Sequence, residues 1–212
     1  VTGTPFNIAA MVKAFALDFG TLLSAIDPTG LLTVQSATLF MTLVLVAASC
    51  IVMGAGLPTT ATYLVLATMG TPALAVLGVV ALQSLFFVFY YGVLADITPP
   101  VALAAYAGAT IAQANLMQTG NTAFRLGAAK ALVPFVFMYA PSMLLVLDGF
   151  TWEEFFIATG GCALGVIMLG AALTGYFVAE MRPWHRWLLG LASILVVAPG
   201  MESGAVGMVL AL

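Results

Sequence analysis

Residues 31–69 read LLTVQSATLFMTLVLVAASCIVM, then GAGLPTT, then ATYLVLATM. The first of these three pieces is long enough to cross a bilayer as a helix, which takes about 20 mostly apolar residues. The third piece is about half that length. The middle piece, residues 54–60, holds two glycines and a proline, which disfavour a continuous helix. The stretch therefore predicts a re-entrant hairpin in an all-α membrane protein, with arms at 32–53 and 59–69 and a tip at 54–58 near the bilayer midplane.

Charged side chains are rare along the whole chain. They make up 6% of the 212 residues and hydrophobic residues 63%, whereas a soluble domain carries roughly 25% charged residues. No charge lies between Asp27 and Asp96, between Asp96 and Arg125, or between Glu154 and Glu180. These gaps fit lipid, where a buried charge is costly. The net charge of −3 and the absence of a basic patch argue against nucleic acid as a partner.

A second break follows the next apolar segment, which we expect to be helical over residues 73–95. The sequence Ala-Asp-Ile-Thr-Pro-Pro ends at residue 100. The two prolines remove two backbone donors, and the first of them disfavours helical geometry at Thr98. We expect helix to resume at about Val101 and to reach about Gln113. Residues 96–100 therefore predict one transmembrane helix with an interrupted middle.

The chain divides into three expected parts. Residues 1–30 form an interfacial or partial helix, either amphipathic at the membrane surface or flanking a missing span. Residues 31–116 form the core with both breaks, 54–58 and 96–100. Residues 117–212 hold a connecting helix and the C-terminal transmembrane helices. In that last part we expect a connecting helix at 118–130, a span at 131–147 with a kink allowed at Pro141, a span at 155–178 and a short apolar segment at 187–199.

The placement of basic residues predicts the orientation. Arg125 and Lys130 precede the first span of the last part, and Arg182 and Arg186 follow the second span. The turn between these spans, 148–154, is acidic. Because Lys and Arg favour the cytoplasmic side, we expect both basic clusters inside and the acidic turn outside.

The two breaks carry the functional prediction. Non-helical backbone persists at membrane depth only where it is buried in protein or lines a cavity, and paired breaks of this kind point to a transporter binding site. A helix N-terminus suits an anionic group, and freed carbonyls suit a cation. Asp96 is the one charge between residues 28 and 124. It serves ion or proton coupling, or it caps the helix that begins near Val101 or pairs with a missing part of the chain.

The candidate ion-binding and transport residues follow from the breaks. For Thr59 and Thr60, the alternative role is hydrogen bonding to the carbonyls of their own helix. The candidates are Gly54, Gly56, Pro58, Thr59, Thr60, Asp96, Thr98, Pro99 and Pro100.

Two other classes of protein compete with a transporter. An intramembrane aspartyl protease would need two facing aspartates, but the chain has no Gly-x-Gly-Asp, and no His-Glu-x-x-His or Gly-x-Ser-x-Gly either. We therefore do not expect an enzyme. A non-transporting membrane subunit or channel component would explain the apolar spans but not the paired breaks. A continuous helix over residues 54–60 would favour it.

Four segments carry a resemblance to a known family. They are GAGLPTTATY (54–63), FVFYYGVLADITPPVALAA (87–105), TGNTAFRLG (119–127) and VPFVF (133–137). In this order they resemble the C-terminal half of the large membrane subunit of TRAP transporters. The likeness is strongest to fused permeases that work with TAXI-type periplasmic binding proteins.

The resemblance implies an elevator-type secondary transporter with two inverted repeats, each made of a re-entrant hairpin and an interrupted helix. Residues 54–60 would be the hairpin tip of the second repeat, in a bacterial or archaeal cytoplasmic (inner) membrane. The family imports organic acids by Na⁺ symport, with a periplasmic substrate-binding protein and a small membrane subunit, fused or separate. H⁺ coupling stays an alternative, and no cofactor beyond the coupling ion is expected.

The resemblance also places Na⁺ near Gly54, Thr59, Asp96 and Thr98. This chain holds a single hairpin and a single interrupted helix, with two or three further spans. We therefore expect the first repeat to be supplied by a separate chain or by the rest of a longer one.

Overall fold

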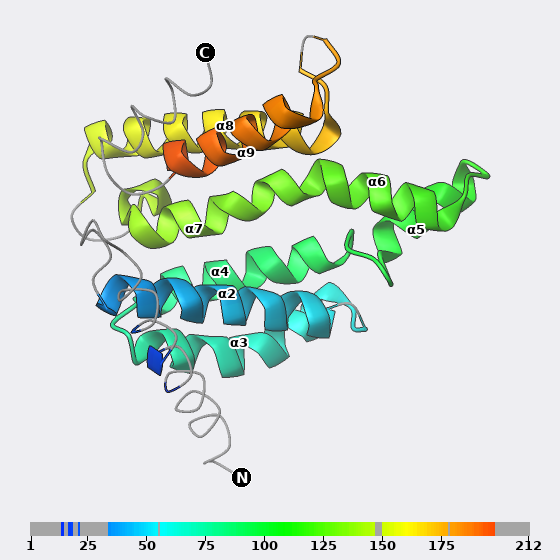
Figure 1. Ribbon diagram of the computed structural model, residues 1–212. Coiled ribbons are helices and arrows are strands. Elements are labelled where there is room, and N and C mark those ends of the chain that lie inside the picture. The colour runs from blue at the N-terminus through cyan, green and yellow to red at the C-terminus, as the bar shows by residue number, and fades with distance from the viewer. Residues whose placement is uncertain are drawn as a thin grey trace. The chain divides into compact units, whose positions relative to one another are not determined.

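The computed structural model describes Ala14, Leu17, Asp18, Thr21 and residues 34–54, 56–146, 150–177 and 179–197. These residues are mostly helical, which confirms the all-α expectation, and between them one isolated bridge pairs Tyr176 with Glu180. The expected helix within residues 1–30 lies almost wholly outside the described part. The chain forms two compact units, Val1–Asp96 and Ile97–Leu212, and each is described separately (Figure 1).

In the described part of the first unit lie three long helices: α2 (Val34–Gly54), α3 (Thr59–Ala75) and α4 (Ala81–Ala95). α2 and α4 run in the same direction, and α3, which connects them in the chain, runs antiparallel to both (Figure 1). Each helix packs on the other two. Gly70 allows this close packing, because a Cβ atom there would lie 2.9 Å from Val88 and 3.2 Å from Val46.

The end of α3 differs from the expectation. The sequence placed a helix end at residues 70–72, but α3 continues through Pro72 to Ala75. A proline this close to a C-terminus removes one hydrogen bond without ending the helix. The turn that follows Ala75 is closed at Gly78 (φ +83°), where the Gly78 N–H donates to the Ala75 carbonyl and the Val79 N–H donates to the Leu74 carbonyl. This Schellman arrangement uses a glycine in the left-handed region. α4 consequently begins at Ala81 rather than at residue 73.

The second unit begins with α5 (Leu103–Ile111) and α6 (Leu116–Ala128). The side chain of Asn115 caps α6 by accepting the Gln118 N–H at 3.0 Å. A 3₁₀ turn (Ala129–Ala131) joins α6 to α7 (Leu132–Tyr139), and the backbone stays helical through Ala129 and Leu132. The expected connecting helix and the expected span therefore follow one another without a non-helical residue between them.

The expected span at 131–147 is wrong in length. α7 ends at Tyr139, and a 3₁₀ turn (Pro141–Leu144) follows. The backbone of Ala140 (φ −123°, ψ 79°) is no longer helical. The reason is that the ring of a proline clashes with a helical conformation of the residue before it. Pro141 thus ends this helix instead of kinking it.

Two further long helices lie in the described part of the unit: α8 (Trp152–Thr174) and α9 (Pro183–Val197). Thr151 caps the start of α8, since its hydroxyl accepts the Glu154 N–H at 3.4 Å, and Gly175, with φ +80°, is the C-cap. The two helices pack closely at Gly165, where a Cβ atom would lie 2.4 Å from the Val197 side chain.

Among the described helices, two are long and apolar enough to cross a membrane, Ala37–Gly54 within α2 and Trp152–Thr174. Their mean hydropathies are 2.2 and 2.0. α4 is apolar but shorter, with 15 residues. Many large apolar side chains on these helices are exposed, including Val52 at 75% and Phe156 at 66%, as lipid contact would require.

Candidate functional site

The first break is a short turn between two helix ends. α2 ends at Gly54, and Pro58 precedes α3 in an extended conformation (φ −57°, ψ 145°). The buried Thr62 stabilises this turn, because its hydroxyl donates a hydrogen bond to the Leu57 carbonyl at 3.2 Å. The Thr62 backbone N–H donates to the Pro58 carbonyl at 3.0 Å. α2 and α3 are therefore separate helices, and residues 54–60 are not one continuous helix.

The C-terminal end of α4 lies directly against this turn. A Cβ atom on Gly54 would lie 2.5 Å from the Ala95 Cβ atom, 3.2 Å from Thr62 and 3.7 Å from the Gly92 carbonyl oxygen. Real Cβ atoms do not approach so closely, so any larger residue at position 54 would push α2 and α4 apart. Gly54 is thus required by packing, at the point where the two helix ends meet.

One hydrogen bond connects the two predicted breaks. The Thr59 hydroxyl donates to the Oδ2 atom of Asp96, although 37 residues separate them. Thr59 is the first residue of α3 and Asp96 is the C-cap of α4. Both side chains are half-buried. Asp96 therefore has a partner in the first break and does not simply cap the helix that follows it.

The helix ends give this place a definite electrostatic character. The C-termini of α2 and α4 each carry about half a negative charge, and the N-terminus of α3 about half a positive charge. Asp96 adds a full negative charge when ionised. The sum of these partial charges and the Asp96 charge is negative, so the region between the three helix ends attracts a cation. The Asp96 carboxylate also lies favourably at the N-terminus of α3, whose cap residue, Pro58, makes no side-chain cap bond.

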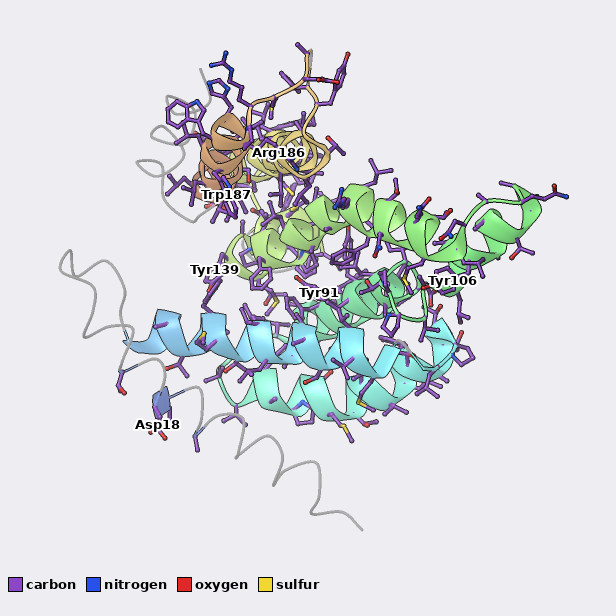
Figure 2. The ribbon with its side chains drawn as sticks, turned by 45° about the vertical axis from the view of Figure 1, so that its right-hand side comes forward. Asp18, Tyr91, Tyr106, Tyr139, Arg186 and Trp187 are labelled. Carbon is purple, nitrogen blue, oxygen red and sulfur yellow. The ribbon has the colours of Figure 1, made fainter. Side chains whose placement is uncertain are left out.

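The second break belongs to the second unit. Ala102 has a left-handed backbone (φ 36°, ψ 50°), and its N–H donates to the Thr98 carbonyl at 3.2 Å. The Pro99–Pro100 peptide bond is cis. Tyr106, labelled in Figure 2, donates its hydroxyl to the Pro100 carbonyl at 2.8 Å. The backbone of this break is therefore held by a side chain from the first turn of α5.

α6 packs against the same break through two glycines seven residues apart. A Cβ atom on Gly120 would lie 2.8 Å from the Tyr106 ring and 3.6 Å from Ala102. A Cβ atom on Gly127 would lie 2.1 Å from the Ile97 side chain. The segment TGNTAFRLG therefore supports the interrupted backbone, a role that its sequence alone does not reveal.

The structure brings together three of the predicted site residues: Gly54, Thr59 and Asp96. Gly56 and Thr60 are exposed beside them, and no atom lies within 4 Å of a Cβ atom built on Gly56. The remaining candidates divide between the tip of the first break and the second unit. Pro58 is exposed at the tip, Thr98 is 7% exposed in the second unit, and Pro99 and Pro100 follow it there.

Four residues of the two breaks were not among the sequence candidates. Thr62 and Gly92 line the first break, and Tyr106 and Gly120 support the second. Thr62 could have been found, since it lies one turn after Thr59 on α3. No sequence pattern indicates the contact between Tyr106 and Gly120, because this contact depends on how α5 packs against α6.

Within the described residues, no group of three or more His, Cys, Asp or Glu side chains could hold a metal ion. A cation at the first break would instead be held by one carboxylate together with hydroxyl and carbonyl oxygens. Hard cations such as Na⁺ accept these ligands.

Comparison with known proteins gives one match. A family model described as "Tripartite ATP-independent periplasmic transporter, DctM component" matches residues 1–151, which is more than half of the chain. Neither the curated proteins nor the solved structures gave a match.

Proposed function

Because this chain belongs to the DctM component family of the tripartite ATP-independent periplasmic transporters, we propose that it is part of an organic-acid importer driven by Na⁺. The family supplies the membrane component of transporters that work with a periplasmic binding protein and a small membrane subunit. The chain is accordingly a membrane protein of a transport system. The coupling ion, the substrate class and the arrangement of subunits are our proposals.

The observation that carries the proposal is the hydrogen bond from Thr59 to Asp96. It joins the start of α3 to the end of α4 at a negatively charged position between the ends of three helices of the first unit. In the structure, the Thr59 hydroxyl donates its hydrogen to the Asp96 carboxylate. When Na⁺ binds to the carboxylate, the hydroxyl can rotate and offer an oxygen lone pair instead. The pair therefore has a stable arrangement both with and without the ion.

The same geometry offers a way to couple the ion to an anionic substrate. The N-terminus of α3, with Thr59 and Thr60, favours a carboxylate group. An ionised Asp96 next to it would repel that group. At a separation of about 6 Å and an effective dielectric constant of about 20, the repulsion is about 3 kcal/mol, which is roughly a hundredfold in affinity. Na⁺ at Asp96 removes this repulsion, so substrate binding would require the ion.

We further propose that α2 and α3 form the re-entrant hairpin of the second repeat in an elevator-type, TAXI-related permease. α3 has 17 residues, about 26 Å at 1.5 Å per residue. Each arm thus exceeds the roughly 15 Å from the bilayer midplane to the edge of the hydrocarbon core. A tip at the midplane would leave both arms anchored at the same membrane face. The first repeat would come from another chain or another part of a longer one.

Two alternatives make different predictions. In an H⁺-coupled transporter, Asp96 would carry the proton itself. A non-transporting membrane subunit would need no ion site. A continuous helix over residues 54–60 would favour such a subunit, but α2 ends at Gly54 and α3 begins at Thr59.

The test is uptake of a labelled organic acid into proteoliposomes that contain the complete transporter and its periplasmic binding protein. We expect uptake only with a Na⁺ gradient and with the binding protein present. Uptake driven by a pH gradient alone would replace Na⁺ by H⁺ in the proposal. A well-folded complete assembly that shows no uptake would overturn the transporter assignment of this chain.

A further inference from the structure

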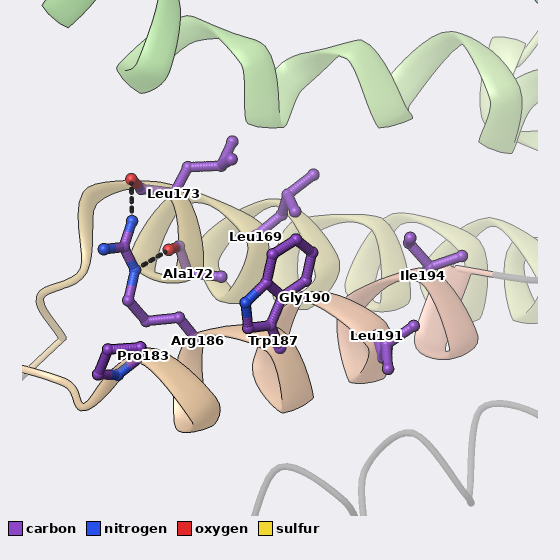
Figure 3. A pocket seen from close by; sticks show the side chains of 9 residues that line it. All are labelled: Leu169, Ala172, Leu173, Pro183, Arg186, Trp187, Gly190, Leu191 and Ile194. Atoms are coloured by element: carbon purple, nitrogen blue, oxygen red, sulfur yellow. Dashed lines mark hydrogen bonds between the residues drawn. The ribbon is translucent and has the colours of Figure 1, made fainter.

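A groove lies between α8 and α9, in the second unit. Its volume is about 440 Å³. Figure 3 shows Pro183 and Arg186 toward one end and Leu191 and Ile194 toward the other. The lining residues are Leu169, Ala172, Leu173, Pro183, Arg186, Trp187, Gly190, Leu191 and Ile194.

The walls of the groove are apolar over most of its length. Trp187 is 77% exposed, Leu191 57% and Ile194 53%, so these side chains have little protein around them. From Pro183 to Ile194 the helix rises about 16 Å at 1.5 Å per residue. A long, narrow apolar groove of this kind fits a hydrocarbon chain better than a compact polar ligand.

The polar end of the groove is fixed by Arg186. Its guanidinium group donates to the Ala172 carbonyl at 2.9 Å and to the Leu173 carbonyl at 3.0 Å (Figure 3). These carbonyls belong to the last turn of α8, where a helix has unsatisfied acceptors. Arg186 therefore ties α9 to the end of α8 and keeps a positive charge at the end of the groove.

A second arginine lies next to this end in the sequence. Arg182 directly precedes the lining residue Pro183. Glu180 is the single carboxylate between residues 175 and 187, and the last turn of α8 has no charged residue. Trp184, 61% exposed, and Trp187 are amphipathic rings of the kind found at headgroup level. The groove thus has a cationic, aromatic end and an apolar body.

We propose that the α8–α9 groove binds an anionic phospholipid, with its phosphate at Arg182 and Arg186 and one acyl chain along Trp187, Leu191 and Ile194. The N-terminus of α9 adds backbone N–H groups that favour a phosphate. An inorganic phosphate would satisfy the cationic end but would leave the apolar body empty. This proposal depends on the chain lying in a membrane and not on Na⁺ coupling.

The experiment uses the full chain with every tryptophan other than Trp187 replaced by phenylalanine, reconstituted in phosphatidylcholine vesicles. Part of the lipid is replaced by phosphatidylglycerol with brominated acyl chains, or by brominated phosphatidylcholine at the same mole fraction. Quenching of Trp187 fluorescence then reports the lipid in the groove. We expect a roughly fivefold preference for phosphatidylglycerol, the gain from about one cationic contact.

Three variants test the two halves of the proposal. Arg182→Ala should reduce the preference to near one, while Arg125→Ala, which removes an exposed arginine from α6, should leave it unchanged. Gly190→Leu should lower quenching by phosphatidylglycerol, because its side chain would fill the groove. Gly190→Ala, whose Cβ would lie 3.9 Å from Ala172, should not.

Several results would overturn the proposal. Equal quenching by the two lipids would show that the groove does not select a charged headgroup. An unchanged preference in Arg182→Ala would remove the assigned phosphate contact. Full quenching in a folded Gly190→Leu variant would exclude the acyl chain from the groove. A preference abolished by millimolar inorganic phosphate at constant ionic strength would assign the cationic end to free phosphate.

Discussion

Thr59, at the start of α3, donates its hydroxyl hydrogen to the carboxylate of Asp96, at the end of α4. The two residues come from different breaks in the chain, and their contact lies where two helix C-termini meet one helix N-terminus. A carboxylate, a hydroxyl and nearby backbone carbonyls are oxygen ligands suited to a hard cation. The ion site that we propose for this chain depends on this contact.

The first prediction concerns the hydroxyl of Thr59. Thr59→Val keeps the shape of the side chain but removes the oxygen, so the apparent affinity for Na⁺ in transport should fall roughly tenfold, the effect of one polar contact. Thr59→Ser keeps the oxygen and should stay within about twofold of the parent. The measurement is the Na⁺ concentration that gives half-maximal uptake. Equal Na⁺ affinities for the Val and Ser variants would exclude Thr59 as a ligand.

The second prediction concerns the contact between α2 and α4. Gly54→Ala places a Cβ atom 2.5 Å from the Ala95 Cβ atom, and such overpacking costs about 1–3 kcal/mol. The melting temperature of the protein in detergent should fall. Gly56→Ala is the matched control, because no atom lies within 4 Å of its new Cβ atom.

A second-site change makes this prediction specific. Ala95→Gly removes the atom that Gly54→Ala would meet, so the double variant should regain most of the lost stability. Failure of Ala95→Gly to rescue Gly54→Ala would show that these two positions are not in contact.

The third prediction concerns the support of the second break by α6. Gly120→Ala would bring a Cβ atom 2.8 Å from the Tyr106 ring, and should displace the ring whose hydroxyl holds the Pro100 carbonyl. We expect lower thermal stability and slower uptake. Gly108→Ala, in α5 with no atom within 4 Å, should be neutral or stabilising by up to about 1 kcal/mol, because alanine favours helix. Equal melting temperatures for the two variants would contradict the contact.

The helical fold could be predicted from the sequence, and some of its boundaries could not. The long charge-free runs predict membrane helices, and Pro58 lies where the sequence favours a helix boundary, directly before α3. Gly70 and Gly78 look alike in the sequence, yet Gly70 serves helix packing and Gly78 ends α3. Local sequence does not separate these roles, because one depends on Val46 and Val88 from other helices.

The candidate site shows the same division. Asp96 stood out as an isolated charge in a long apolar region, and Thr59 as a polar residue beside a break. Their hydrogen bond could not be predicted from spacing, because it depends on the packing of α4 against α3. Pro141 was recognised as a disruption, but its effect, an end to α7 instead of a kink, became visible only in the backbone of Ala140.

The most direct test of the central claim is the Na⁺ dependence of uptake by Asp96→Asn, in the complete transporter with its binding protein. Asparagine keeps the size of the side chain and removes its negative charge. We predict that the apparent Na⁺ affinity falls on the order of a hundredfold, while Asp18→Asn, at an exposed aspartate of the same unit, behaves like the parent. Uptake by Asp96→Asn with unchanged rate and unchanged Na⁺ dependence would contradict the assignment of the ion site to Asp96 and Thr59.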